Sequence, residues 1–253
     1  MNNYRYNIIT LCGSIKFKDE FLKLQEKLTL DGNIVLTPNF FNNVKKEEIN
    51  LPLDISSVGS DEVGTGDYFG PIVVTASYVN KENIELLHNL GVRDSKKLLD
   101  EQILKIVPQF INVIPHQTII LNNLDYNKYH STDMNMNKMK AILHNKVLYE
   151  LVSKNYDTDY VVVDQFCESN KYYEYIDKVK NKVTNITFLT KAEDKVLSVA
   201  CSSLISRYIF IKEINKIGDE LGMFIPKGAN DIVDDVAIKI VKKYQNLWYN
   251  YRE

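Results

Sequence analysis

The residues best suited to chemistry lie in one short segment, residues 59–71. Asp61 and Glu62 are adjacent carboxylates at the end of a short apolar run, and a turn with two glycines follows at residues 64–66. Neighbouring side chains of a strand point to opposite faces, so in an internal strand one acid faces a core or cleft and needs a cation or several donors. The glycines allow a tight turn and leave N–H groups open to a ligand. The segment indicates metal-assisted phosphodiester chemistry, although the acid pair alone favours a hairpin with an acidic end.

Two further acids stand at the expected ends of secondary-structure elements. Asp164 follows the apolar run Tyr160–Val163, as expected of a buried strand that delivers an acid at its tip. Glu193 lies in the expected first turn of a helix. Taken singly, Asp164 is typical of a capping acid and Glu193 of a favourable charge at a helix N-terminus. If the acids converged, they would repel one another and take up protons unless divalent cations neutralised them.

The segment Asp61–Pro71 resembles the signature of the type 2 ribonucleases H, in the form typical of ribonuclease HIII rather than HII. The other matching segments occur in the family's order along the chain. They are residues 94–98, 137–145, 161–166, 190–193, 199–207 and 225–229. The resemblance covers roughly residues 57–247.

The resemblance implies an endoribonuclease that hydrolyses the RNA strand of RNA–DNA hybrids by a two-metal-ion mechanism, leaving 5′-phosphate and 3′-hydroxyl ends. The implied catalytic and metal-binding residues are Asp61, Glu62, Asp164 and Glu193. Oxygen ligands suit two Mg2+ or Mn2+ ions, and the four histidines show no zinc spacing. The candidate substrate-binding residues are Gly64, Thr65 and Gly66 near ribose 2′-hydroxyls, and Lys96, Lys97, Arg207 and Lys227 near phosphates. For any single lysine, a solvated surface position is the alternative.

The chain also departs from the family pattern. Asp194 follows Glu193 where the family usually has serine, and Val196 replaces a commonly larger polar residue. The N-terminal part is shorter than the usual substrate-binding domain, and the chain stops soon after Trp248. We therefore expect reduced activity, and the alternative function is a hybrid-binding protein with weak or no catalysis.

The elements that must position these residues form an α/β pattern with three parts. We predict a small N-terminal βαβ module over residues 1–43, a polar linker over 44–56 and the ribonuclease H type 2 catalytic domain over 57–253. The resemblance implies a ribonuclease H-like fold with a mixed central sheet flanked by helices. Predicted strands of the catalytic domain are 53–60, 72–79, 113–121, 160–163 and 186–189. Predicted helices are 83–90, 100–107 (stopped by Pro108), 136–152, 196–217 and 232–244.

The N-terminal module has its own candidate turn. A strand over 8–12 and a strand over 33–37 flank a helix whose apolar residues recur every three or four positions. The segment Cys12–Ile15 after the first strand weakly resembles nucleoside 2-deoxyribosyltransferase-like proteins, in which such a turn faces a nucleoside. A plain turn between strand and helix is the simpler interpretation, with Ser14 as a helix cap.

Composition is that of an ordinary globular protein: the 253 residues are 45% hydrophobic and 25% charged. The net charge of −2 provides no global basic field, so contacts with nucleic acid must depend on local lysines and arginines. Cys12, Cys167 and Cys201 are expected to be buried, reduced thiols, and no segment is apolar enough for a membrane span. We expect a cytoplasmic monomer with an RNA–DNA hybrid duplex as its partner and no membrane association.

Overall fold

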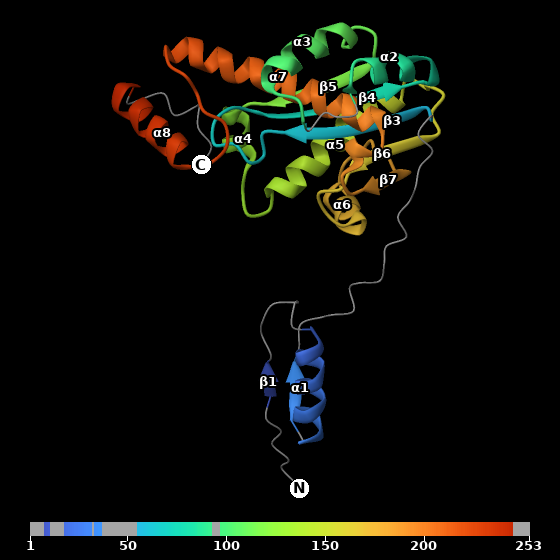
Figure 1. The fold of residues 1–253 in the computed structure, drawn as a ribbon, viewed down its shortest axis with the longest axis vertical. Helices are drawn as coiled ribbons and strands as arrows, with labels where there is room; N and C mark the ends of the chain where they lie inside the picture. The colour runs from blue at the N-terminus through green and yellow to red at the C-terminus, as the bar shows by residue number, and fades with distance from the viewer. Residues whose placement is uncertain (1–7, 11–17, 32, 37–54, 93–96, 245–253) are drawn as a thin grey trace. The chain divides into compact units, whose positions relative to one another are not determined.

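The computed structural model describes residues 8–10, 18–31, 33–36, 55–92 and 97–244. The chain forms two compact units, Met1–Asn50 and Leu51–Glu253 (Figure 1). In the first unit, β1 (Ile8–Thr10) pairs in parallel with β2 (Ile34–Leu36), and α1 (Lys18–Leu30) connects them. The predicted βαβ order of elements is thus confirmed, whereas the predicted bounds of the module stay a prediction. The Cys12–Ile15 turn lies outside the described residues, as does most of the predicted linker, so both stay predictions.

The second unit is built on a mixed five-stranded sheet in the order β5-β4-β3-β6-β7. Its strands are β3 (Ser57–Val63), β4 (Ile72–Val79), β5 (His116–Leu121), β6 (Tyr160–Asp164) and β7 (Ile186–Leu189). The first three form an antiparallel meander, whereas β6 pairs in parallel with both β3 and β7. Every residue of β4 is buried, as expected of a near-continuous apolar strand with helices on both faces.

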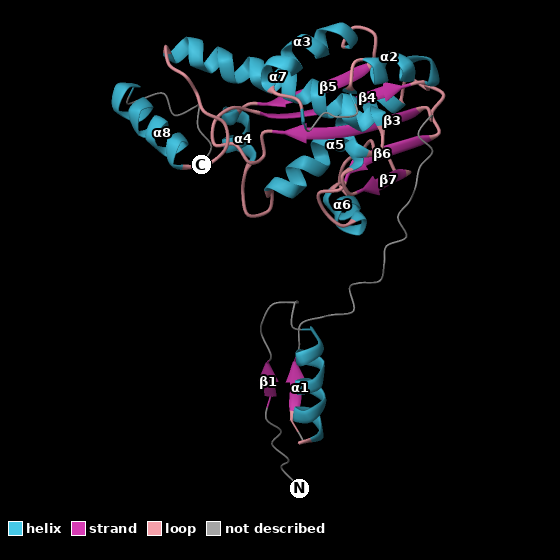
Figure 2. Cartoon of the chain, viewed as in Figure 1, coloured by secondary structure: helices cyan, strands magenta, loops and turns pink. Residues whose placement is uncertain are grey.

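Helices cover both faces of this sheet (Figure 2). The helices α3 (Asp100–Phe110) and α7 (Leu197–Leu221) lie on one face, and α5 (Met136–Val152) lies on the other. The remaining helical elements are η3 (Lys81–Asn83), α2 (Ile84–Asn89), α4 (Asn123–Tyr129), α6 (Ser169–Tyr175), η5 (Ala192–Asp194) and α8 (Asp231–Tyr244). This arrangement confirms the predicted α/β class with a helix-flanked mixed sheet.

Helix α7 packs unusually close to the sheet because small residues line the contact. A Cβ atom added at Gly59 of β3 would lie 2.5 Å from the Val199 backbone nitrogen and 2.5 Å from Ser198 Oγ. Ser202 Oγ donates to the Gly59 carbonyl at 2.8 Å, so its buried hydroxyl is paired. The absence of a side chain at Gly59 thus permits the close approach of α7 to β3.

Some helices differ from the predictions. Pro108 does not end its helix: α3 continues to Phe110, whose ring is fully buried in the core with Val107. That burial offsets the backbone hydrogen bond that a proline cannot donate. Helices α4 and α6 were not predicted, since each has only 7 residues and little apolar periodicity.

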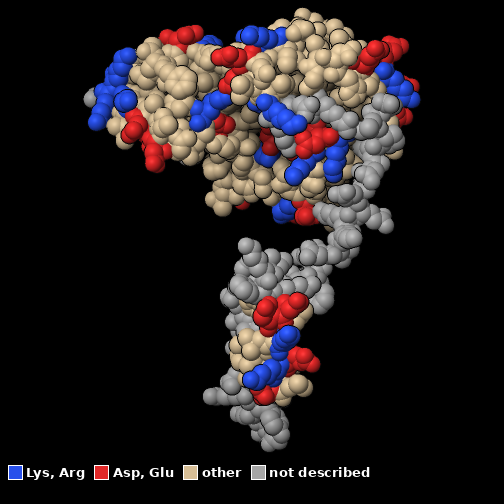
Figure 3. Space-filling model, in the orientation of Figure 1, with Lys and Arg blue, Asp and Glu red and all other residues tan. Residues whose placement is uncertain are grey.

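Charged side chains of both signs are interspersed on the face of the molecule drawn in Figure 3, with no continuous basic surface. No helix in the described part of the chain combines the length and apolar character that a membrane crossing requires. Cys167 and Cys201 are free thiols, Cys201 buried and Cys167 only half-buried, while Cys12 lies outside the described residues.

Candidate active site

The sheet brings two of the predicted acids together. Strands β3 and β6 run in parallel, and their register ends with Ser60 opposite Val163. The next residue of each strand is an acid, so Asp61 and Asp164 follow that pair at the same edge of the sheet. The carboxyl ends of parallel strands are where α/β sheets place their ligands. Asp164 is the last residue of β6, as its position after an apolar run predicted, whereas β3 continues beyond Asp61 to Val63.

Asp61 carries a strongly perturbed carboxyl group. Its side chain is buried, with only 8% of the residue exposed. Burial raises the pKa of Asp61 well above its usual range, and the negative charges of Glu62 and Asp164 raise it further. A hydrogen bond from Ser203 and another from the Glu62 backbone N–H partly offset the rise. A buried acid facing other acids is a site where a cation would relieve unfavourable charge.

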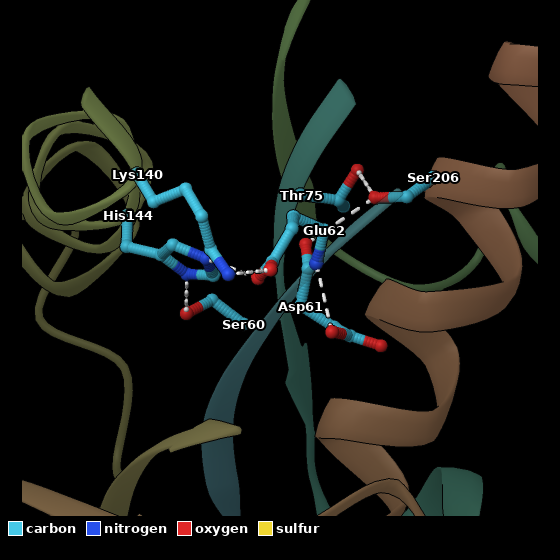
Figure 4. Close-up of polar contacts among 7 residues, drawn as sticks. All are labelled: Ser60, Asp61, Glu62, Thr75, Lys140, His144 and Ser206. Carbon is cyan, nitrogen blue, oxygen red and sulfur yellow. Dashed lines mark hydrogen bonds and ion pairs between the residues drawn. The ribbon is translucent and has the colours of Figure 1, made fainter. Parts of the chain in front are cut away.

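Helix α7 fixes Asp61 from one side through a row of hydroxyl groups spaced four residues apart. Ser206 Oγ donates to Thr75 Oγ1 at 2.9 Å and lies 3.4 Å from the Asp61 carbonyl oxygen (Figure 4). Ser202 Oγ contacts Ser77 Oγ at 3.0 Å, one turn earlier along the helix. Because these contacts tie α7 to both β3 and β4, the Asp61 backbone cannot shift independently of the helix.

Glu62 points to the other face of the sheet, towards α5 (Figure 4). Its carboxylate forms an ion pair with Lys140, and its Oε2 lies 2.8 Å from His144 Nε2. Burial acts to raise the pKa of Glu62, but the hydrogen bond and charges from His144 and Lys140 outweigh it and lower the pKa. The two neighbouring acids therefore have opposite shifts, because they face different elements.

Asp164 and Glu193 are linked through the backbone. Asp164 Oδ1 accepts a hydrogen bond from the Ala192 N–H at 2.7 Å, so η5 sits against the end of β6. Glu193 is buried in the first turn of a helical element, as predicted, and that element is the short η5, which precedes α7. The turn is distinct because Lys191 adopts a left-handed backbone conformation and Val196 is extended.

As they stand, the described residues include no group of three or more His, Cys, Asp or Glu side chains that could hold a metal ion. The predicted quartet therefore stays a prediction, and in this arrangement the Glu62 carboxylate contacts Lys140 and His144. The donor chemistry nevertheless fits a divalent cation, because Asp61 and Asp164 offer hard oxygen ligands and their proximity raises the pKa of Asp61.

The glycine turn has two distinct parts. Gly64 is buried with a φ of +92°, and an added Cβ would lie 2.2 Å from the Pro71 carbonyl oxygen. Gly64 is thus required by the protein's own backbone, because a side chain there would disturb the turn itself. Gly66 is exposed, and a Cβ added there would meet no atom within 4 Å, which leaves this glycine open to a ligand.

Polar contacts link the loop containing Lys227 to this turn, and link Arg207 to the segment that contains Lys97. The Gly228 N–H donates to Asp67 Oδ1 at 2.6 Å, which places the loop containing Lys227 beside the glycine turn. Lys227 forms an ion pair with Asp100 at the start of α3. Arg207 donates to the Leu98 carbonyl at 3.0 Å, next to the exposed Lys97. Lys96 lies outside the described residues.

Arg207 is also close to the acids. Burial lowers the pKa of its guanidinium, while the negative charges of Asp100 and Asp61 counteract that shift. Arg207, Lys227 and the segment containing Lys97 therefore form one rim beside Asp61.

Lys140 and His144 were not identified from the sequence. Both are buried on α5 and both contact Glu62. Their spacing of four residues places them on one helix face, and this spacing was the feature of the sequence that could have identified them. A lysine and a histidine on an otherwise apolar helix face indicate a buried acid opposite.

Comparison with known proteins identifies the domain. The ribonuclease HII family model matches residues 58–251. Ribonuclease HIII of Bacillus cereus (strain 03BB102) is 44% identical over 192 residues, which cover 75% of this chain and 62% of that protein. This chain therefore matches less than two thirds of that relative's length.

Solved structures of ribonucleases H also match this chain. Bst-RNase HIII in complex with Mn2+ matches with a TM-score of 0.75 at 38% identity, over 79% of this chain and 66% of that one. Aquifex aeolicus RNase H3 matches with a TM-score of 0.65 at 25% identity, over 94% of this chain and 96% of that one. Asp61 of β3 and Asp164 at the end of β6 both lie within the matched region, and the chain belongs to the ribonuclease HII family.

Proposed function

We propose that this chain is an endoribonuclease that hydrolyses the RNA strand of RNA–DNA hybrids, leaving 5′-phosphate and 3′-hydroxyl ends. The observation that carries the proposal is that Asp61 and Asp164 lie close together where the pairing of β3 with β6 ends, within a domain of the ribonuclease HII family. Relatives named ribonuclease HIII support the substrate class.

The proposed metal-binding and catalytic residues are Asp61, Glu62, Asp164 and Glu193. Two Mg2+ or Mn2+ ions would supply an activated water and stabilise the leaving oxygen. The Mn2+ complex of Bst-RNase HIII supports this choice of cation. The protein's part is to hold Asp61 in a buried position, where Ser203 and the Glu62 N–H orient its oxygens.

We infer that the glycine turn and four basic residues contact the substrate. Thr65 and Gly66 would approach the ribose 2′-hydroxyls, because a 2′-hydroxyl both donates and accepts hydrogen bonds and Gly66 leaves the backbone accessible. Gly64 sets the shape of that turn. Lys96, Lys97, Arg207 and Lys227 would contact phosphates and position the duplex.

A labelled RNA–DNA hybrid tests the proposal directly. Wild type and Asp61→Asn are compared with Mn2+ or Mg2+, with product ends mapped by phosphatase and ligase treatment. We expect cleavage by the wild type and a loss of at least ~100-fold in the variant, since an essential ligand is removed. Equal rates in both would contradict the proposal. Binding of the hybrid without cleavage by the wild type would instead favour the alternative of a hybrid-binding protein.

We also propose that the protein acts as a cytoplasmic monomer. The free thiols Cys167 and Cys201 are consistent with a reducing compartment. Light scattering of the purified chain, with and without a hybrid, measures the oligomeric state, and a stable dimer would contradict the monomer.

A further inference from the structure

Glu62 is enclosed by side chains from the face of the sheet opposite Asp61. Lys140 pairs with Glu62 Oε1, and His144 Nε2 lies 2.8 Å from Oε2 (Figure 4). Lys140 is 7% exposed and His144 is fully buried. Both carboxylate oxygens are therefore engaged by α5.

The arrangement is built around the carboxylate. Lysine is almost never buried unless it is paired, because removing its charge from water is costly. Lys140 has two such partners, the Glu62 carboxylate and the Phe166 ring, whose centroid lies 4.2 Å from Nζ. The His144 ring stacks on the same Phe166 ring at 5.2 Å.

The hydrogen bonds of His144 have a defined direction. An ionised carboxylate only accepts hydrogen bonds, so Nε2 of His144 donates to Glu62. The other ring nitrogen, Nδ1, lies 2.8 Å from Ser60 Oγ. Ser60 thus fixes the ring, and the ring fixes Glu62, with each link buried and directional.

We propose that Lys140 is an internal counter-ion that competes with a divalent cation for Glu62, and that His144 is the positioning residue that holds the second oxygen. The inference rests on the proposed function, in which Glu62 contributes to cation binding. Without a cation, Lys140 compensates the charge of Glu62 beside Asp61 and Asp164. When a cation binds, Glu62 Oε1 must leave Lys140 or be shared with it, so Lys140 weakens cation binding.

Removing the competitor should therefore tighten cation binding, the opposite of what loss of a merely structural residue would do. The experiment is titration calorimetry of Mn2+ into the full chain without nucleic acid. We expect the Kd of Lys140→Met to fall roughly tenfold below that of the wild type, which corresponds to about 1.4 kcal/mol. Lys140→Arg keeps the charge and should retain an affinity near that of the wild type.

The matched control is Lys146→Met, which removes the same charge from an exposed position on the same helix. It should leave the Kd within about twofold, because an exposed charge is screened by solvent. His144→Leu should weaken binding by releasing Glu62, and His144→Gln, which keeps a donor, should restore much of the loss.

An unchanged or weaker Mn2+ affinity in folded Lys140→Met would overturn the inference. If that variant fails to fold, Lys140→Gln carries the same expectation and the same refutation. Hybrid cleavage measured on the same samples separates the two proposals. If Lys140→Met binds Mn2+ with unchanged affinity while the wild type cleaves the hybrid, only the counter-ion role of Lys140 is overturned. A wild type that binds no Mn2+ and cleaves no hybrid overturns both.

Discussion

Gly59→Ala tests whether the spacing between α7 and β3 is set by backbone contact. The added Cβ would lie 2.5 Å from the Val199 nitrogen and 2.7 Å from the Ser198 carbonyl carbon. Neither backbone atom can rotate away, so the whole helix must shift. Overpacking of this kind costs about 1–3 kcal/mol, and the contacts place Gly59→Ala in the upper half of that range.

A smaller opposing effect comes from the unfolded chain. Replacing glycine by alanine lowers the conformational entropy of the unfolded state and so adds about 0.4–1 kcal/mol to the free energy of unfolding. The expected net loss in free energy of unfolding is therefore about 1–2.5 kcal/mol, or roughly 2–10 °C in Tm for a domain of this size. Because Ser203 and Ser206 move with α7, hybrid cleavage should also fall.

The assay is guanidinium unfolding followed by circular dichroism in the presence of a chelator. Gly66→Ala is the matched control, because a Cβ there meets no atom within 4 Å and the midpoint should not change. Ser198→Ala removes the Oγ atom 2.5 Å from the new methyl group but leaves the backbone contact. In a double-mutant cycle it should therefore recover little stability.

Two results would refute the reasoning. A midpoint for Gly59→Ala equal to that of the wild type at unchanged m-value would mean that the helix does not need this glycine. Full recovery by Ser198→Ala would mean that the clash is with a side chain, so that the helix backbone does not set the spacing.

Asp61→Asn should stabilise the chelator-treated protein above the ordinary carboxyl pKa. The pKa of Asp61 is raised in the folded state, so wild-type stability falls as the pH rises towards that pKa, and the variant lacks this dependence. Urea unfolding at several pH values measures the difference in free energy of unfolding, and a difference that does not change with pH would contradict the prediction. Gly64→Ala should cost more than ~1 kcal/mol by thermal unfolding, because its φ is +92° and Pro71 blocks a Cβ, whereas a wild-type Tm would refute the strain. Gly66→Val should keep the wild-type Tm but raise the KM for hybrid, and an unchanged KM would remove this residue from the substrate contacts. Lys227→Met should weaken hybrid binding and reduce the slope of log K against log salt by about one, and an unaltered slope would exclude a phosphate contact.

Much of the second unit could be predicted from local pattern. The bounds of β4, α5 and β7 agree with the predicted ranges, because apolar periodicity and clear flanking residues determine them locally. The position of Asp164 at the end of β6 also followed from the apolar run before it. Short elements such as α4 and α6 escaped prediction because they hold too few residues for a period to emerge.

Local pattern was enough to select the candidate residues: two adjacent acids, an acid at a strand end and a glycine turn. Which of these residues meet depends on how distant elements pack. The strand order places Asp61 beside Asp164, and the packing of α5 turns Glu62 towards Lys140 and His144. The physical reason is that periodicity is encoded over a few residues, whereas the partners of a buried charge come from strands and helices distant in the chain.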